Sequence, residues 1–261
     1  MNDSVPMPVD VRLMNLTASL LFAGFAVLVV VAAMGWVLRQ PVFALRAIQV
    51  QGDMAHSNAL TLRANVAPKL SGTFFTVDLN KTRQAFEAVP WVRKAEVRRD
   101  FPNRLRVRLQ EHQVAGYWGP ESESRLVNTY GEVFDANVDE VEQDSLPRFI
   151  GPDGQGPALL AMYQAVKPMF EDMDLVVEQM ELTGRGSWRV TLDNGADLEL
   201  GRGPAEELLP RVQRFLKTLT QVAAKYGRSP QSLESADLRY AQGYALRLRG
   251  VATVAQAQPK P

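Results

Sequence analysis

The segment Leu16–Leu38 runs without a single charged side chain, and no other property of the sequence constrains the chain as strongly. A helix of that length rises about 34 Å, enough to cross a hydrocarbon core of about 30 Å. Inside lipid every backbone amide needs a partner within its own segment, which an uncharged helix provides. Trp36 lies near one end, where an indole ring sits well among lipid headgroups. We therefore predict a membrane-spanning helix over residues 16–38.

A cleaved secretory signal is the alternative interpretation of this segment. Signal peptides have an apolar core of about 7–15 residues that follows a basic stretch. Here the apolar run is longer, and the residues before it carry Asp3 and Asp10 but only one base, Arg12. A permanent anchor with a short tail before it is therefore favoured. Arginines flank the helix on both sides, so the positive-inside rule does not fix its orientation.

Composition excludes several classes of function for the rest of the chain. The sequence has 29 basic and 29 acidic side chains, so no net field attracts nucleic acid. The absence of cysteine from the sequence rules out an acylated lipoprotein, a disulfide scaffold, a thiolate nucleophile and cysteine zinc sites. The only histidines are His56 and His112, and each is more readily explained as a surface or capping residue than as a catalyst or metal ligand.

The sequence also lacks the short motifs of common enzyme classes. No nucleophile elbow, phosphate-binding loop or metalloprotease motif occurs in it. The segment Gly201-Arg202-Gly203 precedes a predicted helix and could hold an anion at the helix N-terminus, but a plain turn into the helix is favoured. We therefore predict no catalytic residues, no metal site and no cofactor.

Periodicity predicts a small α+β unit after the anchor. The expected elements are a strand over 45–51, helices over 58–66 and 80–88, and strands over 92–99 and 104–110. Asn58 and Asn80 stand where helix N-caps are expected. This β-α-α-β-β order is typical of a two-layer sandwich in which the helices cover one face of the sheet.

The last strand of this unit alternates bases with aliphatic residues. Period two places its arginines on one face of the sheet. With the preceding strand they form a basic face over residues 93–108, made of Arg93, Lys94, Arg98, Arg99, Arg104, Arg106 and Arg108. Such a face could meet anionic lipid or an acidic partner, but a solvated strand face is the simpler explanation. Aromatic residues do not interleave with the bases, which argues against nucleic acid.

From about residue 113 the pattern indicates a second, mixed unit. The expected elements are a hairpin over 125–135, a helix over 157–172, strands over 175–182, 188–192 and 196–200, a helix over 206–226, and a strand pair over 233–240 and 244–249. Asn194-Gly195 is a strong hairpin signal, and Gln242-Gly243 forms the expected last turn. Pro210 fits the second helix only if that helix is kinked or starts later.

Together these features resemble the FtsQ/DivIB family of bacterial cell division proteins. In the first unit, the residues that are similar to those of a POTRA domain are Val89-Pro90-Trp91-Val92, Ala95-Glu96-Val97-Arg98-Arg99, Pro102, Leu105, Val107 and Glu111. In the second unit, the residues that are similar to those of the family are Leu146-Pro147, Gly151-Pro152, Ser187-Trp188, Leu192-Asp193-Asn194-Gly195, Leu200-Gly201-Arg202, and Asp237-Leu238-Arg239-Tyr240 with Gly243 and Ala245. The series covers nearly the whole chain in the family's order.

The resemblance implies an α+β fold in five parts. These are a cytoplasmic tail over 1–15, a transmembrane helix over 16–38, a POTRA domain over 43–112, a mixed α/β domain with an open edge strand over 113–250, and a disordered tail over 251–261. It also implies a single-pass type II topology in the inner (cytoplasmic) membrane. Both domains would then lie in the periplasm, at the division septum.

The resemblance further implies a non-enzymatic divisome scaffold that binds FtsB and FtsL and helps assemble and regulate septal peptidoglycan synthesis. In this family a segment of FtsB adds to the open edge as a further strand. The residues that would line this contact are Arg185, Arg239, Tyr240, Gly243, Tyr244, Ala245, Leu246 and Leu248. Arg185 would pair with an acidic residue, and the two tyrosines would supply area and hydroxyl groups. Leu248 stands where relatives often carry tryptophan, so it would bury less area.

Three alternatives stay open at this point. One is a POTRA adaptor for outer-membrane assembly or secretion, although such proteins usually carry repeated POTRA units or a barrel. Another is a membrane-anchored enzyme that acts on the cell wall, which needs a convergent acid/base or nucleophile set. The third is that residues 239–248 form a plain hairpin without a partner. Nucleic acid and a small-molecule substrate are not expected as ligands.

Overall fold

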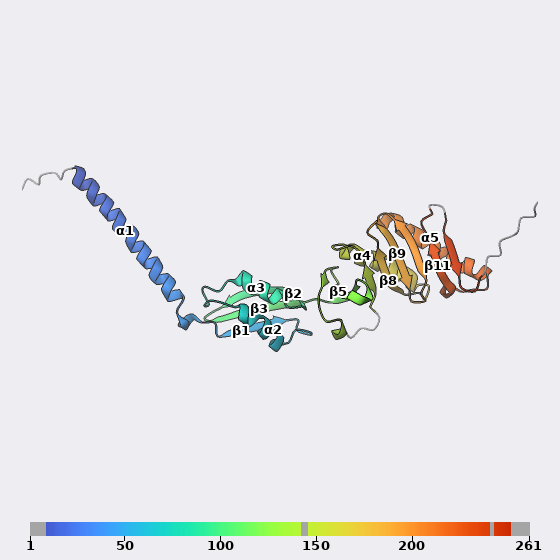
Figure 1. The fold of residues 1–261 in the computed structure, drawn as a ribbon, viewed down its shortest axis with the longest axis horizontal. Helices are drawn as coiled ribbons and strands as arrows, with labels where there is room; N and C mark the ends of the chain where they lie inside the picture. Colours follow the sequence, from blue (N-terminus) through green and yellow to red (C-terminus); the bar gives the residue numbers. More distant parts are fainter. Residues whose placement is uncertain (1–8, 142–145, 241–242, 252–261) are drawn as a thin grey trace, which may run out of the picture. The chain divides into compact units, whose positions relative to one another are not determined.

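The chain is an α+β protein in which one long apolar helix precedes two separate β-sheets, each packed with its own helices (Figure 1). A computed structural model describes residues 9–141, 146–240 and 243–251. The chain divides into two compact units, Met1–Glu111 and His112–Pro261. The predicted fold class is thus confirmed. The terminal tails expected over 1–15 and 251–261 lie mostly outside the described residues.

The N-terminal helix α1 (Val9–Leu38) is apolar along most of its length, and none of its residues is buried. The mean hydropathy of its most apolar stretch is 2.5. Its length and composition fit a single-pass membrane anchor. The helix begins at Val9 rather than at Leu16, because residues 9–15 contain neither proline nor glycine to interrupt it.

The first unit is the predicted β-α-α-β-β sandwich. Its elements are β1 (Ala47–Gly52), α2 (Ala59–Val66), α3 (Leu79–Glu87), β2 (Val92–Asp100) and β3 (Arg104–Glu111). The strand order is β1-β3-β2, with β1 parallel and β2 antiparallel to β3. Leu62 and Phe86 from the helices pack with Val107 and Leu109 of β3 in one core. Along β3 the arginines are exposed and the aliphatic residues buried, as the alternation predicts.

The caps of the two helices in this unit illustrate the accuracy of the sequence signals. Asn58 caps α2 as predicted, and its Oδ1 accepts a hydrogen bond from the backbone N–H of Thr61 at 2.8 Å. Helix α3, however, is capped by Asp78 rather than by Asn80. The Asp78 carboxylate accepts hydrogen bonds from the N–H groups of Asn80 and Lys81. A carboxylate at this position also interacts favourably with the helix dipole, which favours the earlier start.

The second unit contains a nine-stranded mixed sheet with the order β12-β11-β10-β9-β8-β7-β4-β5-β6. Its strands are β4 (Val114–Trp118), β5 (Arg125–Asn128), β6 (Val133–Phe134), β7 (Arg148–Ile150), β8 (Val177–Leu182), β9 (Ser187–Leu192), β10 (Asp197–Arg202), β11 (Leu233–Asp237) and β12 (Ala245–Leu248). The sequence pattern did not predict β4 or β7. Both are short, and they pair in parallel with each other across a long stretch of chain, which local periodicity does not detect.

Two helices, α4 (Gly156–Glu171) and α5 (Ala205–Lys225), pack on this sheet and on each other. Phe170 of α4 and Phe215 of α5 are fully buried in the shared core. Pro210 lies inside α5, so the helix does not start after it as one of the two expectations required. At this position proline removes one intrahelical hydrogen bond and crowds the carbonyl of Glu206, so the helix continues past it at a cost in stability. The remaining short 3₁₀ turns are η1 (Pro41–Phe43), η2 (Ala67–Lys69), η3 (Glu121–Glu123), η4 (Val138–Glu140) and η5 (Pro230–Ser232).

A buried carboxylate fastens the loop between β1 and α2 to the sheet. Glu111 is 5% exposed, and its oxygens accept hydrogen bonds from the N–H groups of Ala55, His56 and Ser57 at 2.9, 3.1 and 2.7 Å. Burial raises the pKa of Glu111, but the hydrogen-bonding groups of Ser57, His56 and Ala55 lower it by more. Its pKa therefore lies below the ordinary value, and the charged form stabilises the fold.

We expect Glu111→Gln to destabilise the first unit by about 1–3 kcal/mol at neutral pH, because an amide group cannot accept all three backbone donors. Since the folded pKa is depressed, the stability from Glu111 is present above about pH 4.3 and is lost as the pH falls through the folded pKa. Urea unfolding of the unsubstituted chain and of Glu111→Gln across this pH range should show a difference in unfolding free energy that shrinks on acidification. A difference in unfolding free energy that is constant with pH would contradict the lowered pKa of Glu111 in the folded chain.

Candidate partner-binding edge

Strand β12 lies at one end of the nine-stranded sheet and pairs only with β11 among the described strands (Figure 1). The pairing is antiparallel, from Asp237 opposite Ala245 to Leu233 opposite Leu248, and contains one irregularity. Within residues 9–141, 146–240 and 243–251, no strand covers the other side of β12. Such a margin presents unpaired N–H and C=O groups to which a further strand can bind.

Alternation along β12 divides its side chains between two faces. Ala245 and Arg247 are exposed, whereas Leu246 is half-buried and Leu248 is buried in the core. Tyr244 is half-buried and packs against the same core, where it contacts Phe215 and Thr218 of α5. The inward residues therefore hold the strand in place, and a partner on this margin would meet mainly backbone and the two exposed side chains.

Tyr244 makes the most specific of these inward contacts. Its hydroxyl lies 2.6 Å from Oγ1 of Thr218 on α5. Its ring meets Phe215 edge to face, with the ring centroids 5.0 Å apart. A half-buried aromatic ring combined with a hydrogen-bonded hydroxyl fixes the start of β12 relative to α5. The sequence prediction placed Tyr244 in the partner contact, and the structure places its side chain on the domain's own helix.

Arg239 and Tyr240 lie just beyond the end of β11. The Arg239 guanidinium makes a two-pronged contact with Asp237, with Nε 2.9 Å from Oδ1 and Nη2 2.6 Å from Oδ2. The hydrogen bond from Arg239 lowers the pKa of Asp237, which keeps this pair charged. Tyr240 is 59% exposed and offers an aromatic ring to solvent. Gly243 is exposed, whereas its neighbour Gln242 lies outside the described residues.

Arg239 borders a polar hollow of about 400 Å³ at the end of β10. The lining residues are Ser187, Gly201, Arg202, Arg211 and Arg239. Every charged residue of this lining is an arginine, so the hollow favours an anion such as a carboxylate. Gly201 has a φ of +93°, and an added Cβ would stand only 3.1 Å from Cγ of Arg239. The positive φ therefore favours glycine at this irregularity of β10, and the missing side chain leaves room for Arg239.

Arg185 occupies the exposed turn between β8 and β9, two residues before Ser187. Ser187 pairs with Arg202 of β10, so Arg185 lies toward the same end of the sheet as the arginine hollow. Two strands, β10 and β11, separate β9 from β12 in the sheet. At about 4.8 Å per strand, β9 is roughly 14 Å from the open margin. Arg185 and the strand residues 244–248 thus belong to neighbouring but distinct patches.

The sequence analysis did not single out Arg211 or Thr218. Both lie on α5, and only the packing of that helix brings Arg211 to the end of β10 and Thr218 beneath Tyr244. At Gly201-Arg202-Gly203 the sequence favours a plain turn over an anion site, and two of these residues, Gly201 and Arg202, line the hollow. Among the described residues, no group of three or more histidine, aspartate or glutamate side chains is placed to hold a metal ion.

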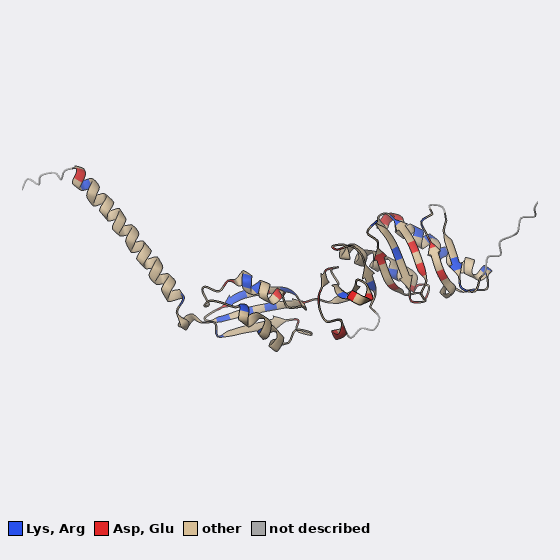
Figure 2. Cartoon of the chain, viewed as in Figure 1, with Lys and Arg blue, Asp and Glu red and all other residues tan. Residues whose placement is uncertain are grey.

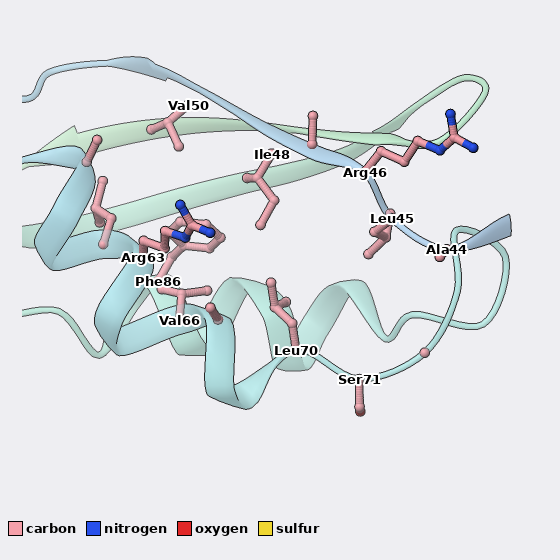
Figure 3. Close-up of a pocket in the computed structure, with 15 residues that line it drawn as sticks. Ala44, Leu45, Arg46, Ile48, Val50, Arg63, Val66, Leu70, Ser71 and Phe86 are labelled. Carbon is pink, nitrogen blue, oxygen red and sulfur yellow. The ribbon is translucent and has the colours of Figure 1, made fainter. Parts of the chain in front are cut away.

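A second hollow, of about 660 Å³, lies in the first unit between β1 and the helices (Figure 3). Ile48 and Val50 of β1 point toward Val66 and Phe86 across it. The lining is mostly apolar, and β1 is the margin of its own sheet. None of the site residues predicted from the sequence lies in this groove.

Known proteins with similar sequences match both units. The family described as "POTRA domain, FtsQ-type" matches residues 43–112, and "Cell division protein FtsQ/DivIB, C-terminal" matches residues 116–239. The cell division protein FtsQ of Burkholderia pseudomallei is 41% identical over 243 residues, which cover 93% of this chain and 94% of that protein. FtsQ of Bordetella pertussis is 38% identical over 256 residues, with 92% of each chain covered. FtsQ of Nitrosospira multiformis is 34% identical over 239 residues, which cover 90% and 96%.

Two substitutions of Tyr244 should separate the contribution of its ring to stability from the contribution of its hydroxyl group. Tyr244→Phe removes only the hydroxyl and should cost about 1 kcal/mol of unfolding free energy. Tyr244→Ala also removes the ring from Phe215 and should cost about 2–3 kcal/mol. Chemical denaturation followed by circular dichroism measures both values. Equal stability of the alanine variant and the unsubstituted chain would show that the ring does not support the strand.

Proposed function

Because the chain belongs to the FtsQ/DivIB family of bacterial cell division proteins, we propose that it is a non-enzymatic scaffold that binds FtsB and FtsL. It helps assemble and regulate septal peptidoglycan synthesis, and a segment of FtsB adds to the sheet beside β12. The observation that carries this proposal is the position of β12 at the margin of the nine-stranded sheet, with no described strand on its outer side.

Strand addition suits this margin for physical reasons. The partner gains a ladder of backbone hydrogen bonds, and its side chains then determine which partner is accepted. β12 is already fixed by Tyr244, Leu246 and Leu248, so little ordering is needed when the partner binds. Such preorganisation lowers the entropy cost of association. The exposed Ala245 and Arg247 leave the opposite face accessible to partner side chains.

The arginine hollow supplies the charge recognition in this proposal. An acidic side chain of FtsB binds among Arg202, Arg211 and Arg239, and a second acidic residue pairs with Arg185. Tyr240 offers exposed ring area next to these cations, and such residues are common in interface cores. Gly243 leaves room for a close backbone approach. Electrostatic complementarity of this kind mainly sets partner choice and the association rate.

Family membership also supports one of the alternative functions over the others. The relatives are named cell division proteins, which favours division over an outer-membrane adaptor or a cell-wall enzyme. The apolar helix α1 would anchor the chain in the inner membrane with a short cytoplasmic tail. Both folded units would then lie in the periplasm, at the septum, where the partners are reached. No cofactor and no small-molecule substrate are needed for this role.

Reversal of the charge at Arg239 tests the hollow. We expect Arg239→Glu to weaken capture of the FtsB–FtsL complex by about tenfold or more, because it removes one cation and places repulsive charge opposite the partner's carboxylate. Arg125→Glu is the matched control, since Arg125 is an exposed arginine of β5 in the same domain. Titration calorimetry or biolayer interferometry on the purified full-length chain measures both affinities. If the two variants bind equally well, the hollow is not part of the contact.

Crosslinking along the last strand tests the edge itself. The chain contains no cysteine, so single cysteines can be introduced without background reaction. We expect cysteines at 245 and 247 to crosslink to FtsB, because both positions are exposed on β12. A cysteine at Val133 of β6, at the opposite end of the sheet, should not crosslink. Equal yields at 133 and 245 would overturn strand addition at β12 and leave family membership unaffected.

A further inference from the structure

Phenylalanines from three separate loops meet at one end of the first unit. Phe43 lies in η1, Phe74 and Phe75 lie in the loop before α3, and Phe101 lies in the turn between β2 and β3. The centroids are 5.1 Å apart for Phe43–Phe75, 5.1 Å for Phe74–Phe75 and 6.3 Å for Phe74–Phe101. All three pairs are edge to face, so the rings form one continuous phenylalanine cluster.

Much of this apolar surface is turned to the outside. Phe101 is 80% exposed and Phe75 is 42% exposed, although Phe74 beneath them is buried. Val42, next to Phe43 in the chain, is 75% exposed. A turn such as Asp100–Asn103 does not require a phenylalanine, and a contiguous exposed apolar patch usually marks an interaction site.

The cluster is held firmly rather than on a loose loop. The Arg99 guanidinium donates to the carbonyl oxygens of Phe74 and Val77, each at 2.8 Å. The N–H of Phe74 donates to the carbonyl of Phe43 at 2.8 Å. These hydrogen bonds fix the loop of Phe74 and Phe75 to β2 and to η1, which gives the cluster an anchored base.

The position of the cluster along the chain places it next to the bilayer. Phe43 follows Leu38, the last residue of α1, by only a few residues, which span at most about 18 Å even when extended. In addition, Oγ1 of Thr73 donates a hydrogen bond of 2.7 Å to the carbonyl of Leu38 itself. The headgroup region extends about 5–8 Å beyond each side of the hydrocarbon core. The loop that carries Phe74 and Phe75 is therefore bonded to the chain where it leaves the membrane.

Basic side chains accompany the cluster. Arg39 follows α1 directly, and the backbone N–H of Arg46 bonds to Asn103 in the turn that carries Phe101. Arg104 is the next residue after that turn and is exposed. Figure 2 shows further bases along the strands of the first unit. Aromatic rings flanked by cations are typical of surfaces that lie in the headgroup region of anionic membranes.

We propose that the phenylalanine cluster is a second membrane contact, in which Phe75 and Phe101 enter the lipid headgroup region and Arg39, Arg46 and Arg104 face anionic phosphates. The first unit is then held against the bilayer instead of moving freely on its tether. β1 and β3 both start at this end, with Ala47 opposite Arg104, and run away from it.

The opposite end of the unit provides an internal control. The loop after β1 carries Met54, which is 46% exposed and also apolar. The paired stretch of β1 and β3 spans about 20 Å at 3.3 Å per residue, so Met54 is far from the cluster. A label at 54 should therefore stay in water while a label at 101 contacts lipid.

The test uses the full-length chain in vesicles of phosphatidylethanolamine and phosphatidylglycerol. Phe101→Cys and Met54→Cys are each labelled with an environment-sensitive fluorophore, since the natural chain has no cysteine. We expect lipids with a nitroxide in the headgroup region to quench the label at 101 several-fold more than the label at 54. Equal quenching at both positions would overturn the proposal. A label at 101 that is shielded from water but not quenched by lipid would also overturn it, and would indicate a protein partner or a second copy.

A paired substitution checks that the rings themselves make the contact. With the label at position 75, Phe101→Asp should reduce quenching by lipid, because it places a negative charge among anionic headgroups. Met54→Asp makes the same change at the far end and should leave quenching unaltered. Phe101 is so exposed that its replacement leaves the core intact, which far-ultraviolet circular dichroism verifies. Unchanged quenching in Phe101→Asp would mean that the cluster does not rest on lipid.

Discussion

The packing of α5 beneath the last strands is the interaction on which the second unit and its proposed function depend. An edge strand of four residues has only one neighbour to bond with, so its own backbone pairing cannot hold it firmly. Leu248 and Tyr244 compensate by burying their side chains against the core that α5 completes. The same contact that stabilises the strand leaves its outer margin open. Stability and availability for binding are thus provided by different sides of one strand.

Local sequence signals predicted the first unit well. The arginine–aliphatic alternation of β3 and the cap at Asn58 are each read from a few neighbouring residues, and each matches the structure. The errors were also local in origin. Asp78 and Asn80 are both good N-caps, and spacing alone did not choose between them. α1 extends back to Val9 through residues that include Asp10, Arg12 and Asn15, and these polar residues lie outside the uncharged anchor signal.

In the second unit, several features could not be predicted from local sequence patterns. β4 and β7 consist of few residues and pair across distant parts of the chain, so neither has a visible period. Gly116 is part of the reason that they pack so closely, since a Cβ there would stand 2.4 Å from the carbonyl oxygen of Pro147. The strand pair at residues 233–249 was predicted from the sequence pattern, but its role as a partner contact was predicted only through the family resemblance. The inward turn of Tyr244 and the convergence of Arg211 with Arg239 depend on where α5 lies, which no short motif encodes.

The contact between Arg239 and Asp237 has a consequence for how a complex would come apart. Arg239 already has a counterion in the unbound protein, so an incoming carboxylate exchanges places with Asp237 or shares the guanidinium with it. Departure of that carboxylate does not leave a bare cation, because Asp237 is only two positions away. The net electrostatic gain is smaller than for an isolated arginine, but the barrier to release is smaller too. A partner that bound in the proposed way would therefore be held by a reversible exchange of carboxylates on Arg239.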